Sequence, residues 1–295
     1  MVRTLHSGVS RGTEALVLND QVPPRVADLM RAPFQVGARP GPVQYGYLNV
    51  GVVEDGPQSL LGRRVFCLFP HQDRYVVPFS ALVPIPDDVP SDRAVLAGTV
   101  ETAINVLWDA SPAWGDRVAV IGAGLIGLSV AALLRDFPLT KLVLVDPDPD
   151  KRTFAASLGL DLKSPDAIPS DLDLVIHASA TQQGLASGLS ALGVEGTLVE
   201  ASWFGQDEPV VPLGADFHAK RLTLRSSQVG RVPTSQAPRR TLRDRLELAL
   251  TELSDPIYDA WLTSRGSFES LPQTMAALGA GELTGLMHVV DYPHV

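Results

Sequence analysis

The sequence predicts an α/β protein: a β-rich region followed by a doubly wound parallel sheet. From residue 118 onward, short apolar runs of strand length alternate with helical patterns, which indicates an open parallel sheet with helices on both faces. Before about residue 95, short apolar runs are bounded by Gly and Pro, as expected of a small barrel or sandwich.

The parallel sheet is predicted from strand-like runs that share one pattern. Residues 118–122 (VAVIG) form a continuous apolar run, typical of a buried central strand. The further strand-like runs are 141–146, 173–179 and 196–202, and the helical patterns between them are 125–137, 150–159 and 183–192. This alternation is what a parallel sheet needs, because each parallel connection crosses over through a helix.

More helices are predicted outside this alternation, at 93–109, at 239–253 and around Leu271, with a strand at 287–292. The apolar side of the second helix comprises Leu242, Leu246, Ala249, Leu250 and Leu253. Eight of the 24 basic residues fall between Lys220 and Arg245. Those on the helix face away from the leucine stripe, so we expect a solvated face rather than an anion site.

Composition restricts the class of function. The 295 residues suit two domains, and a net charge of -9 makes nucleic acid and anionic membrane poor partners. Cys67 is the single cysteine, which excludes an intramolecular disulfide and a cysteine-built zinc site. The N-terminal residues have no apolar signal segment, and no apolar run is long enough to span a bilayer. We therefore expect a cytoplasmic protein that acts on a small molecule.

A glycine-rich motif lies where the first strand of the alternation meets its helix. Its residues are Gly122, Ala123, Gly124, Leu125, Ile126 and Gly127. In a dinucleotide-binding loop, the first glycine allows a tight turn, the second lets the backbone approach the pyrophosphate, and the third lets the helix pack on the strand. The pyrophosphate then binds at the helix N-terminus, where free N–H groups favour an anion.

Asp146 ends the second strand, 19 residues after Gly127. A carboxylate there accepts hydrogen bonds from ribose hydroxyls and repels a 2'-phosphate, so NAD(H) is preferred. Lys151 and Arg152 lie one turn further on, which keeps NADP(H) possible. A methyltransferase that places Asp146 on the ribose of S-adenosylmethionine is the alternative for this motif.

Segments along the whole chain resemble, in order, the medium-chain dehydrogenase/reductase superfamily of zinc-type alcohol dehydrogenases. They are 7–14 (SGVSRGTE), similar to the family's CGTD segment, 45–56 (YGYLNVGVVEDG), similar to GHExxGxVxxxG, 115–127, and 262–290. The resemblance implies a GroES-like catalytic domain of residues 1–102 with 262–295 and a Rossmann domain of residues 103–261. It also implies a cleft between them where nicotinamide meets substrate, and a homodimer.

The chain departs from the family at its metal sites. The zinc-binding Cys is replaced by Ser10 or Arg11, the His of GHE by Tyr47, and its Glu by Leu48. Glu101 matches a position that is a ligand in some polyol-type members. One carboxylate cannot hold zinc, which needs three or four protein ligands. The four cysteines of the structural zinc lobe are absent as well, so we expect a zinc-free member.

A further departure concerns the start of the chain. Family members have additional strands before the CGTD segment, so either the start is late or the barrel is shortened. The SRGTE form at residues 10–14 also resembles bacteriochlorophyllide hydroxyethyl dehydrogenases. That resemblance implies, as a weaker alternative, a hydroxyethyl side chain on a tetrapyrrole-like substrate.

Three residues are candidates for catalysis. Thr13 matches the hydroxyl residue that begins the family's proton relay, although it could simply form a turn. Tyr47 replaces a zinc ligand, so its phenol is a candidate general acid or an aromatic filling the metal's volume. Glu101 could hydrogen-bond Tyr47 or substrate, or brace its helix. Arg11 could bind a substrate carboxylate or a cofactor phosphate, or be an ordinary surface residue.

Strand ends supply the remaining candidates for cofactor binding. His177, Ala178 and Ser179 end one predicted strand, where a contact to the nicotinamide ribose is expected. Ser202 and Trp203 end the next and could wall the nicotinamide, although the tryptophan could also be plain core. His71 is a candidate site residue too, whereas a metal cluster of His71 with its neighbours Cys67 and Asp73 is disfavoured, because a strand points alternate residues apart.

The predicted function is a zinc-independent, NAD(P)(H)-dependent oxidoreductase that interconverts an alcohol and a carbonyl compound, or reduces an enone. Without zinc, hydrogen-bond donors must stabilise the developing oxyanion. A catalytically silent dinucleotide-binding sensor or partner protein is the alternative from another class.

Overall fold

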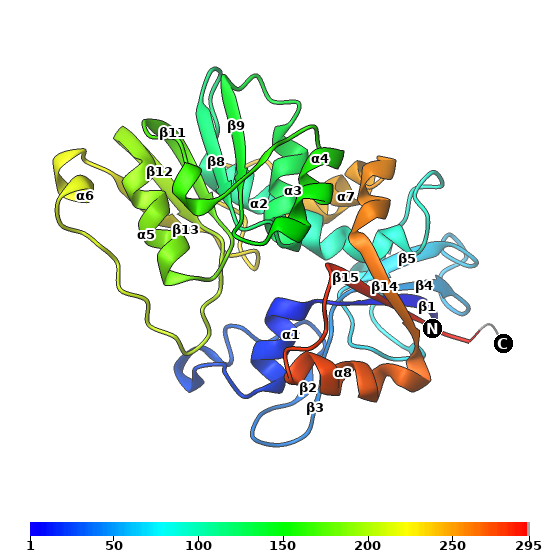
Figure 1. Ribbon diagram of the computed structural model, residues 1–295. Coiled ribbons are helices and arrows are strands. Elements are labelled where there is room, and N and C mark those ends of the chain that lie inside the picture. Colours follow the sequence, from blue (N-terminus) through cyan, green and yellow to red (C-terminus); the bar gives the residue numbers. More distant parts are fainter. Residues whose placement is uncertain (294–295) are drawn as a thin grey trace. The chain divides into compact units, whose positions relative to one another are not determined.

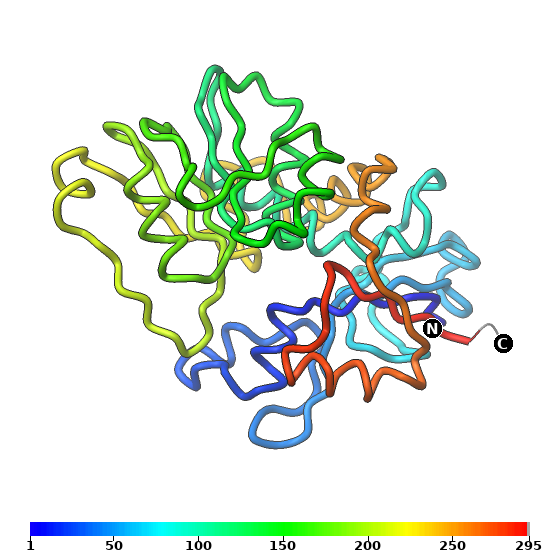
Figure 2. The backbone as a smooth tube through the Cα atoms, viewed as in Figure 1, coloured from blue at the N-terminus to red at the C-terminus, as the bar shows by residue number. Residues whose placement is uncertain are grey.

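The computed structural model describes residues 1–293, and the chain divides into two compact units. The first unit is Met1–Gly98 with the segment from Leu246 onward, and the second is Thr99–Arg245. Residues 246–261, which the sequence prediction assigned to the Rossmann domain, lie in the first unit. Residues 294–295 of the predicted closing segment lie outside the described part. Figure 2 traces the chain through both units.

The second unit contains a six-stranded parallel sheet, as predicted for a Rossmann domain. In spatial order its strands are β10 (Leu162–Lys163), β9 (Lys141–Val145), β8 (Arg117–Ile121), β11 (Leu172–His177), β12 (Leu192–Glu200) and β13 (Thr223–Ser226). The order reverses at β8, between β9 and β11, and ligands of such sheets bind beyond the carboxyl ends of the strands at this point.

Helices connect and cover this sheet (Figure 1). They are α2 (Ala97–Ala110), α3 (Leu125–Leu134), α4 (Arg152–Ser157), α5 (Gln182–Ala191) and α6 (Asp216–Ala219), with short turns η4 (Pro149–Lys151) and η5 (Pro165–Ala167). Helix α3 contacts β8 and β9, whereas α5 contacts β11 and β12. The apolar faces of β8, β9, β11 and α5 meet in one core cluster that includes Val145, Leu185 and Leu189.

The first unit is built on a mainly antiparallel sheet of seven strands. Their order is β14 (Leu262–Ser267), β15 (Met287–Asp291), β1 (Val2–Val9), β4 (Asn49–Val53), β5 (Arg64–Cys67) and β7 (Val83–Pro84), with β6 (Arg74–Tyr75) beside β1. Strand β15 pairs antiparallel with β1, so the end of the chain returns to its start. The predicted β-rich domain with a late return strand is therefore confirmed.

Short elements complete the first unit. They are α1 (Arg11–Leu18), α8 (Leu271–Gly279), the hairpin β2 (Val36–Gly37) and β3 (Val43–Gln44), and the turns η1 (Pro24–Val26), η2 (Phe79–Ala81), η3 (Arg93–Leu96), η6 (Pro256–Trp261) and η7 (Phe268–Ser270). Helices α1 and α8 contact each other. No helix in residues 1–293 is long and apolar enough to cross a membrane.

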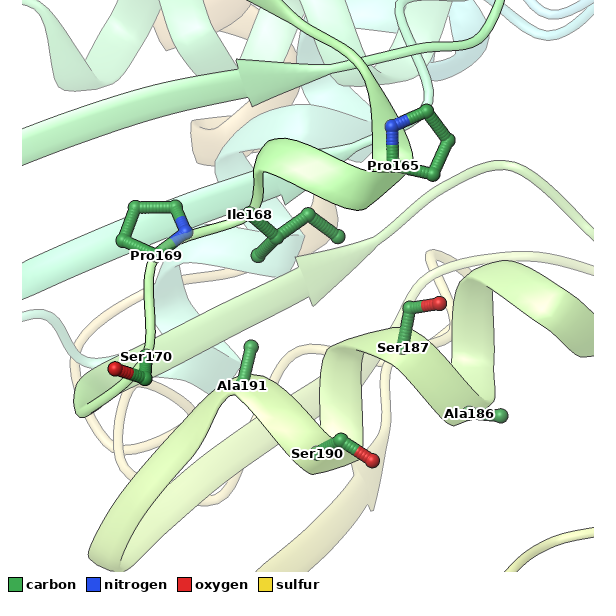
Figure 3. A pocket seen from close by; sticks show the side chains of 8 residues that line it. All are labelled: Pro165, Ile168, Pro169, Ser170, Ala186, Ser187, Ser190 and Ala191. Carbon is green, nitrogen blue, oxygen red and sulfur yellow. The ribbon is translucent and has the colours of Figure 1, made fainter.

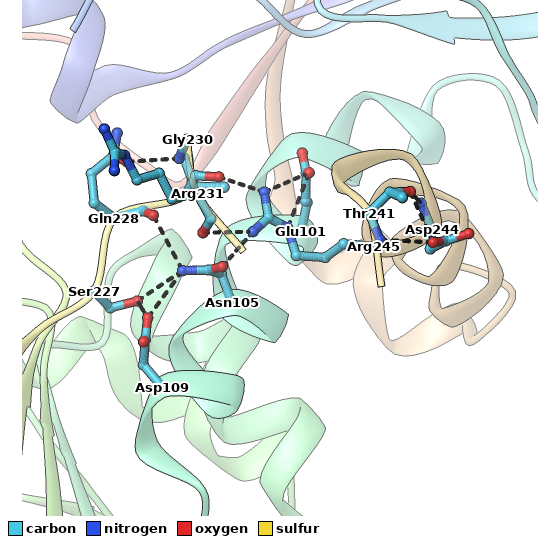
Figure 4. A network of polar contacts seen from close by, with 11 residues as sticks. Glu101, Asn105, Asp109, Ser227, Gln228, Gly230, Arg231, Thr241, Asp244 and Arg245 are labelled. Carbon is cyan, nitrogen blue, oxygen red and sulfur yellow. Dashed lines mark hydrogen bonds and ion pairs between the residues drawn. The ribbon is translucent and has the colours of Figure 1, made fainter. Parts of the chain in front are cut away.

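Helix α7 corrects one prediction. It spans Leu242–Glu252, and Leu242 is 48% exposed, so that residue is not part of the buried stripe. Arg245 is only 1% exposed, and the predicted solvated basic face is wrong at this position. The physical reason is its place one turn before Ala249, on the side of the helix that is buried. Its guanidinium is paired with the Glu101 carboxylate, as Figure 4 shows.

Candidate functional site

The glycine loop joins β8 to α3, and two of its glycines are required by close contacts. Gly122 has a φ of +104°, and a Cβ there would lie 2.8 Å from the Ser179 amide nitrogen. A Cβ on Gly127 would lie 1.8 Å from the Gly122 carbonyl oxygen. Gly124 differs, because a Cβ there would meet nothing within 4 Å. Open space beside this backbone is what the approach of a pyrophosphate requires.

The start of α3 is free of side-chain caps. Gly124 is the N-cap residue and makes no side-chain hydrogen bond, so the first amides of the helix, on Leu125 and Ile126, can bind an anion. Directly after β9, the Asp146 carboxylate accepts hydrogen bonds from the Ala123 amide at 2.7 Å and from the Asp148 amide at 2.9 Å. Each of its oxygens keeps a lone pair for a ribose hydroxyl. These residues therefore fit a dinucleotide.

A buried polar chain lies at the carboxyl ends of β11 and β12. His177 is fully buried, with Nδ1 at 2.6 Å from a Glu200 carboxylate oxygen and Nε2 at 2.7 Å from the Ser179 hydroxyl. In the neutral tautomer, Nδ1–H donates to Glu200 and Nε2 accepts the Ser179 proton. The Ser179 oxygen lies 2.9 Å from the Thr181 hydroxyl, which caps α5 at Gly184. His177 therefore orients two hydroxyls at the expected ribose site.

Hydrogen bonds from the end of β12 hold the residues that follow β11. The Ser202 amide donates to Glu200 at 2.8 Å, and the Ser202 hydroxyl accepts from the Ala180 amide at 3.0 Å. Trp203 is half-buried, so it is not a fully buried core residue. The Phe204 ring stacks on His177 with a centroid distance of 6.2 Å. Ala178 donates its amide to the Ile121 carbonyl, which ties the end of β11 to β8.

The second unit also contains an open hollow of about 400 Å³ (Figure 3), and no residue of the glycine loop lines it. It lies between residues 165–170 and the side of α5. Proline, isoleucine, alanine and serine side chains line it, so it offers no charged group to a phosphate. The glycine loop remains the site in this unit that suits a dinucleotide.

In the first unit, the structure brings Ser10, Thr13 and Tyr47 together. The Tyr47 hydroxyl donates to the Ser10 oxygen at 2.6 Å and also hydrogen-bonds with the Thr13 side chain. Ser10 is the N-cap residue of α1, and Thr13 belongs to the first turn of that helix, which places both hydroxyls at one end of it. We call these three residues the hydroxyl cluster.

The environment of Tyr47 keeps its phenol protonated. Burial raises its pKa to about 12, and the hydrogen bonds from Ser10 and Thr13 only partly oppose this effect. The negative charge of Glu14 raises the pKa as well. The neutral phenol is therefore a hydrogen-bond donor, and not an anion, at physiological pH.

A buried acid–base pair adjoins the hydroxyl cluster. The Glu14 carboxylate lies 3.1 Å from His71 Nε2, and its other oxygen accepts from the Ser10 amide at 2.7 Å. His71 Nδ1 lies 2.7 Å from the Ser7 hydroxyl, which in turn is 3.0 Å from the Tyr292 hydroxyl. The structure thus places His71 in a chain of polar groups that reaches the hydroxyl cluster through Glu14.

Two other residues considered from the sequence, Arg11 and Cys67, take no part in the hydroxyl cluster. Arg11 donates to the Gly285 carbonyl, and burial lowers the pKa of its guanidinium. Cys67 is buried, and burial raises the pKa of its thiol to about 12. Among residues 1–293, no group of three or more His, Cys, Asp and Glu side chains is arranged to hold a metal ion.

Comparisons with known proteins agree with this architecture. No family model matches the chain. D-xylulose reductase A of Aspergillus oryzae is 26% identical over 59% of this chain and 54% of that protein, so the chain spans about half the length of the curated relatives it matches. Alcohol dehydrogenase TADH of Thermus sp. ATN1 superposes with a TM-score of 0.76 at 20% identity, covering 99% of this chain and 92% of that one. This chain has the medium-chain dehydrogenase fold.

A second solved structure supports the same conclusion. An alcohol dehydrogenase of Escherichia coli CFT073, in complex with NADH, has a TM-score of 0.73 at 17% identity and covers 98% of this chain and 90% of its own. The resemblance inferred from the sequence segments is therefore confirmed, together with the predicted GroES-like and Rossmann domains.

The positions of the family's catalytic zinc ligands carry other chemistry in this medium-chain dehydrogenase fold. Ser10, one of the two residues that match the zinc-binding Cys, hydrogen-bonds to Tyr47, which matches the His. Leu48 matches the Glu that follows this His and is a fully buried core residue. Zinc in proteins is held by thiolate, imidazole and carboxylate groups. Two neutral hydroxyls at the positions of the Cys and His ligands do not fit it.

Glu101 lies on α2 and is 4% exposed. One carboxylate oxygen accepts from Arg245 Nε at 3.1 Å and from Nη2 at 3.0 Å, and Asn105 also receives a hydrogen bond from this guanidinium (Figure 4). Burial raises the pKa of Glu101, although Arg245 opposes the rise. Of the roles considered for Glu101, this ion pair with Arg245 corresponds to the one in which Glu101 braces its helix.

Three residues of these sites were not among the sequence candidates: Glu14, Thr181 and Glu200. Glu14 lies four residues after the N-cap Ser10, one position beyond the Glu of a regular capping box, so that motif does not disclose its bond to the Ser10 amide. Glu200 is the register partner of His177 on the neighbouring strand, which only the strand alignment discloses. Thr181 precedes the glutamines that open α5, so it is recognisable as a helix cap.

Proposed function

We propose that this chain is a zinc-independent, NAD(P)(H)-dependent oxidoreductase that interconverts an alcohol and a carbonyl compound. The observation that carries the proposal is the glycine loop, where Gly124 faces open space and Asp146 is anchored next to the loop. Similarity to D-xylulose reductase A and to an NADH-bound alcohol dehydrogenase supports it.

The residues of the second unit hold and orient the cofactor. When bound, a nicotinamide dinucleotide supplies or accepts the hydride. The amides at the start of α3 bind the pyrophosphate, and Asp146 accepts from the ribose hydroxyls, which favours NAD(H) over NADP(H). Ser179 and Thr181, oriented by the His177–Glu200 pair, present hydroxyls to the nicotinamide ribose.

The residues of the first unit handle the proton. Tyr47 donates its phenolic proton to the substrate oxygen as a carbonyl is reduced. The Tyr47 oxygen then takes a proton from solvent through the hydroxyl of Ser10 or Thr13, which gives one proton and receives another. The same donors stabilise negative charge on that oxygen, a role that zinc has in other members of the superfamily. Elemental analysis tests this part: stoichiometric zinc that is lost together with activity on chelation would contradict it.

The cofactor proposal is tested by calorimetry on the full chain with NADH and NADPH. We expect NADH to bind more tightly than NADPH, and Gly124→Ala to weaken both, because a methyl group occupies the space that the pyrophosphate needs. A chain that binds neither dinucleotide would refute the proposal.

A catalytically silent dinucleotide-binding sensor is the second candidate. The observation in its favour is the pKa of about 12 for Tyr47, because a general acid works best with a pKa near the operating pH. NADH-linked turnover of a carbonyl panel that is lost in Tyr47→Phe would exclude the sensor. Tight NADH binding without turnover of any carbonyl compound would favour it.

A further inference from the structure

The first unit has a cavity of about 680 Å³ that is open to the surface and that no residue of the hydroxyl cluster lines. Two helices form its walls, because α1 contributes Glu14, Val17 and Leu18 and α8 contributes Leu271, Pro272 and Met275. These helices contact each other and lie side by side in Figure 1. Pockets for small molecules have volumes of roughly 300–1,000 Å³, so this cavity has the size of a ligand site.

The exposed surface of the cavity is mainly apolar, and its polar lining residues form two groups. Gln44 donates to the Gln72 side chain at 2.9 Å, and the second group contains His71. His71 bonds to Glu14, and the His71 amide donates to the Tyr45 carbonyl at 3.1 Å. Burial raises the pKa of Tyr45, so its phenol is a neutral donor. A few connected polar groups in an apolar pocket are typical of sites that orient a largely apolar ligand by one end.

The charges at the cavity do not suit an anionic ligand. Glu14 is buried next to His71, and its carboxylate repels a phosphate or a carboxylate. Arg39 and Glu269 also line the cavity, and they contribute one charge of each sign. Arg39 is exposed and already donates to the Leu18 carbonyl at 3.1 Å. A strongly anionic ligand would therefore lack a buried cation.

The cavity adjoins the hydroxyl cluster. The rings of Tyr45 and Tyr47 meet edge to face with a centroid distance of 6.1 Å. Glu14 lines the cavity and accepts from the amide of Ser10, which belongs to the cluster. A molecule that fills the cavity thus has one end close to the Tyr47 proton donor.

We infer that this cavity binds the body of the substrate, and that the substrate is a neutral, largely apolar alcohol or carbonyl compound rather than a polyol or a sugar phosphate. The substrate role rests on the proposed function. Hydroxyl groups of a polyol placed against Val17, Leu271 or Met275 would lose water and gain no hydrogen-bond partner, which disfavours polyols. The inference separates this chain from relatives named for a sugar, such as D-xylulose reductase A.

The test measures binding directly on the full chain, by calorimetry with the bicyclic ketone 2-decalone and with xylitol. NADH binding is measured separately and reports whether the cofactor site of the second unit is intact. Met275→Trp fills the cavity, and Val76→Trp, at a site 77% exposed in the same unit and away from the cavity lining, is its matched control. Leu18→Trp fills the cavity from the α1 side and replaces Met275→Trp if thermal unfolding shows that variant to be misfolded.

We expect 2-decalone to bind the wild type more tightly than xylitol does. The filling variant should weaken 2-decalone binding at least about tenfold and leave NADH affinity unchanged, and the control should change neither. Equal 2-decalone affinity in wild type and in the filling variant would overturn the inference.

The inference and the proposed function fail in different ways. Turnover of xylitol in preference to cyclic alcohols, with NADH binding intact, would overturn the inference and leave the proposed function in place. If 2-decalone binding were sensitive to Met275→Trp and the chain bound no NADH, the proposed function would fail, and the substrate role of the cavity with it.

Discussion

The glycine loop of the second unit and the hydroxyl cluster of the first are built in different ways. The loop is made of consecutive residues, and its shape follows from backbone contacts such as that of Gly127 with the Gly122 carbonyl. The hydroxyl cluster joins side chains from separate segments, Ser10 on α1 and Tyr47 before β4. A backbone site can therefore be predicted from a short motif, whereas a side-chain site needs the fold that brings its members together.

The largest expected effect tests the backbone character of the loop. Gly127→Ala places a methyl group 1.8 Å from the Gly122 carbonyl, so α3 must move away from β8. We expect the free energy of unfolding to fall by about 3 kcal/mol, as for other overpacked sites. Urea denaturation measures it, and Gly124→Ala is the matched control, because it meets nothing in the protein and should weaken NADH binding without changing stability.

The next effect tests the hydroxyl cluster as the proton source. Tyr47→Phe removes the donor, and we expect carbonyl reduction to slow about 100-fold, the lower end for general acid catalysis. Because the pKa of Tyr47 is about 12, the protonated donor persists as the pH rises through 10 and is lost only as it approaches 12. The wild-type rate should therefore show no loss of this proton near pH 10.

Steady-state kinetics over this pH range check the prediction, with Tyr75→Phe as the control. Tyr75 lies on β6 of the same unit, and its hydroxyl is outside the cluster. A reduction rate that is equal in Tyr47→Phe and in Tyr75→Phe would remove Tyr47 from the proton path.

A smaller effect tests the buried pair beside the cluster. Glu14→Gln removes the negative charge and one of the two acceptor oxygens that His71 and the Ser10 amide use. We expect a loss of about 2 kcal/mol in the free energy of unfolding, since the one remaining oxygen can serve only one of these buried partners. Glu54→Gln is the control, because Glu54 pairs with Arg3 and Arg74 at the surface. Thermal and urea unfolding should therefore show a larger loss of stability in Glu14→Gln than in Glu54→Gln. Equal losses in the two variants would contradict the burial of the Glu14–His71 pair.

The smallest effect concerns the choice of cofactor. Asp146→Ser removes the negative charge and one hydrogen bond to the Ala123 amide. We expect the preference for NADH over NADPH to fall about tenfold, which corresponds to ~1.4 kcal/mol. Competitive calorimetry with the two dinucleotides measures the ratio, and an unchanged ratio would place the ribose elsewhere.

The sequence predictions were accurate for features that depend on local motifs and less accurate for contacts between distant segments. Four strands of the parallel sheet and the helices between them were predicted, because each has its own local hydrophobic pattern. The edge strands β10 and β13 were not predicted, because β10 has only two residues and β13 is exposed along its whole length. Arg245 was predicted to be solvated, yet it is buried against Glu101. The spacing of leucines identifies the apolar face of a helix. An arginine at the border of that face can still be buried if an acidic side chain pairs with it. The partner of Arg245 is Glu101, which lies 144 residues away in the sequence and is not visible in the pattern of the helix.

The sequence by itself determined the glycine loop and the central strands of the sheet that carries it, because both depend on residue types at consecutive or motif-spaced positions. Only the tertiary structure decided that Ser10, Thr13 and Tyr47 share hydrogen bonds, that His71 pairs with Glu14, and that residues of α1 and α8 line one open cavity. These features arise from packing between segments far apart in the chain, where the free energy of burial, and not local conformation, selects the partners.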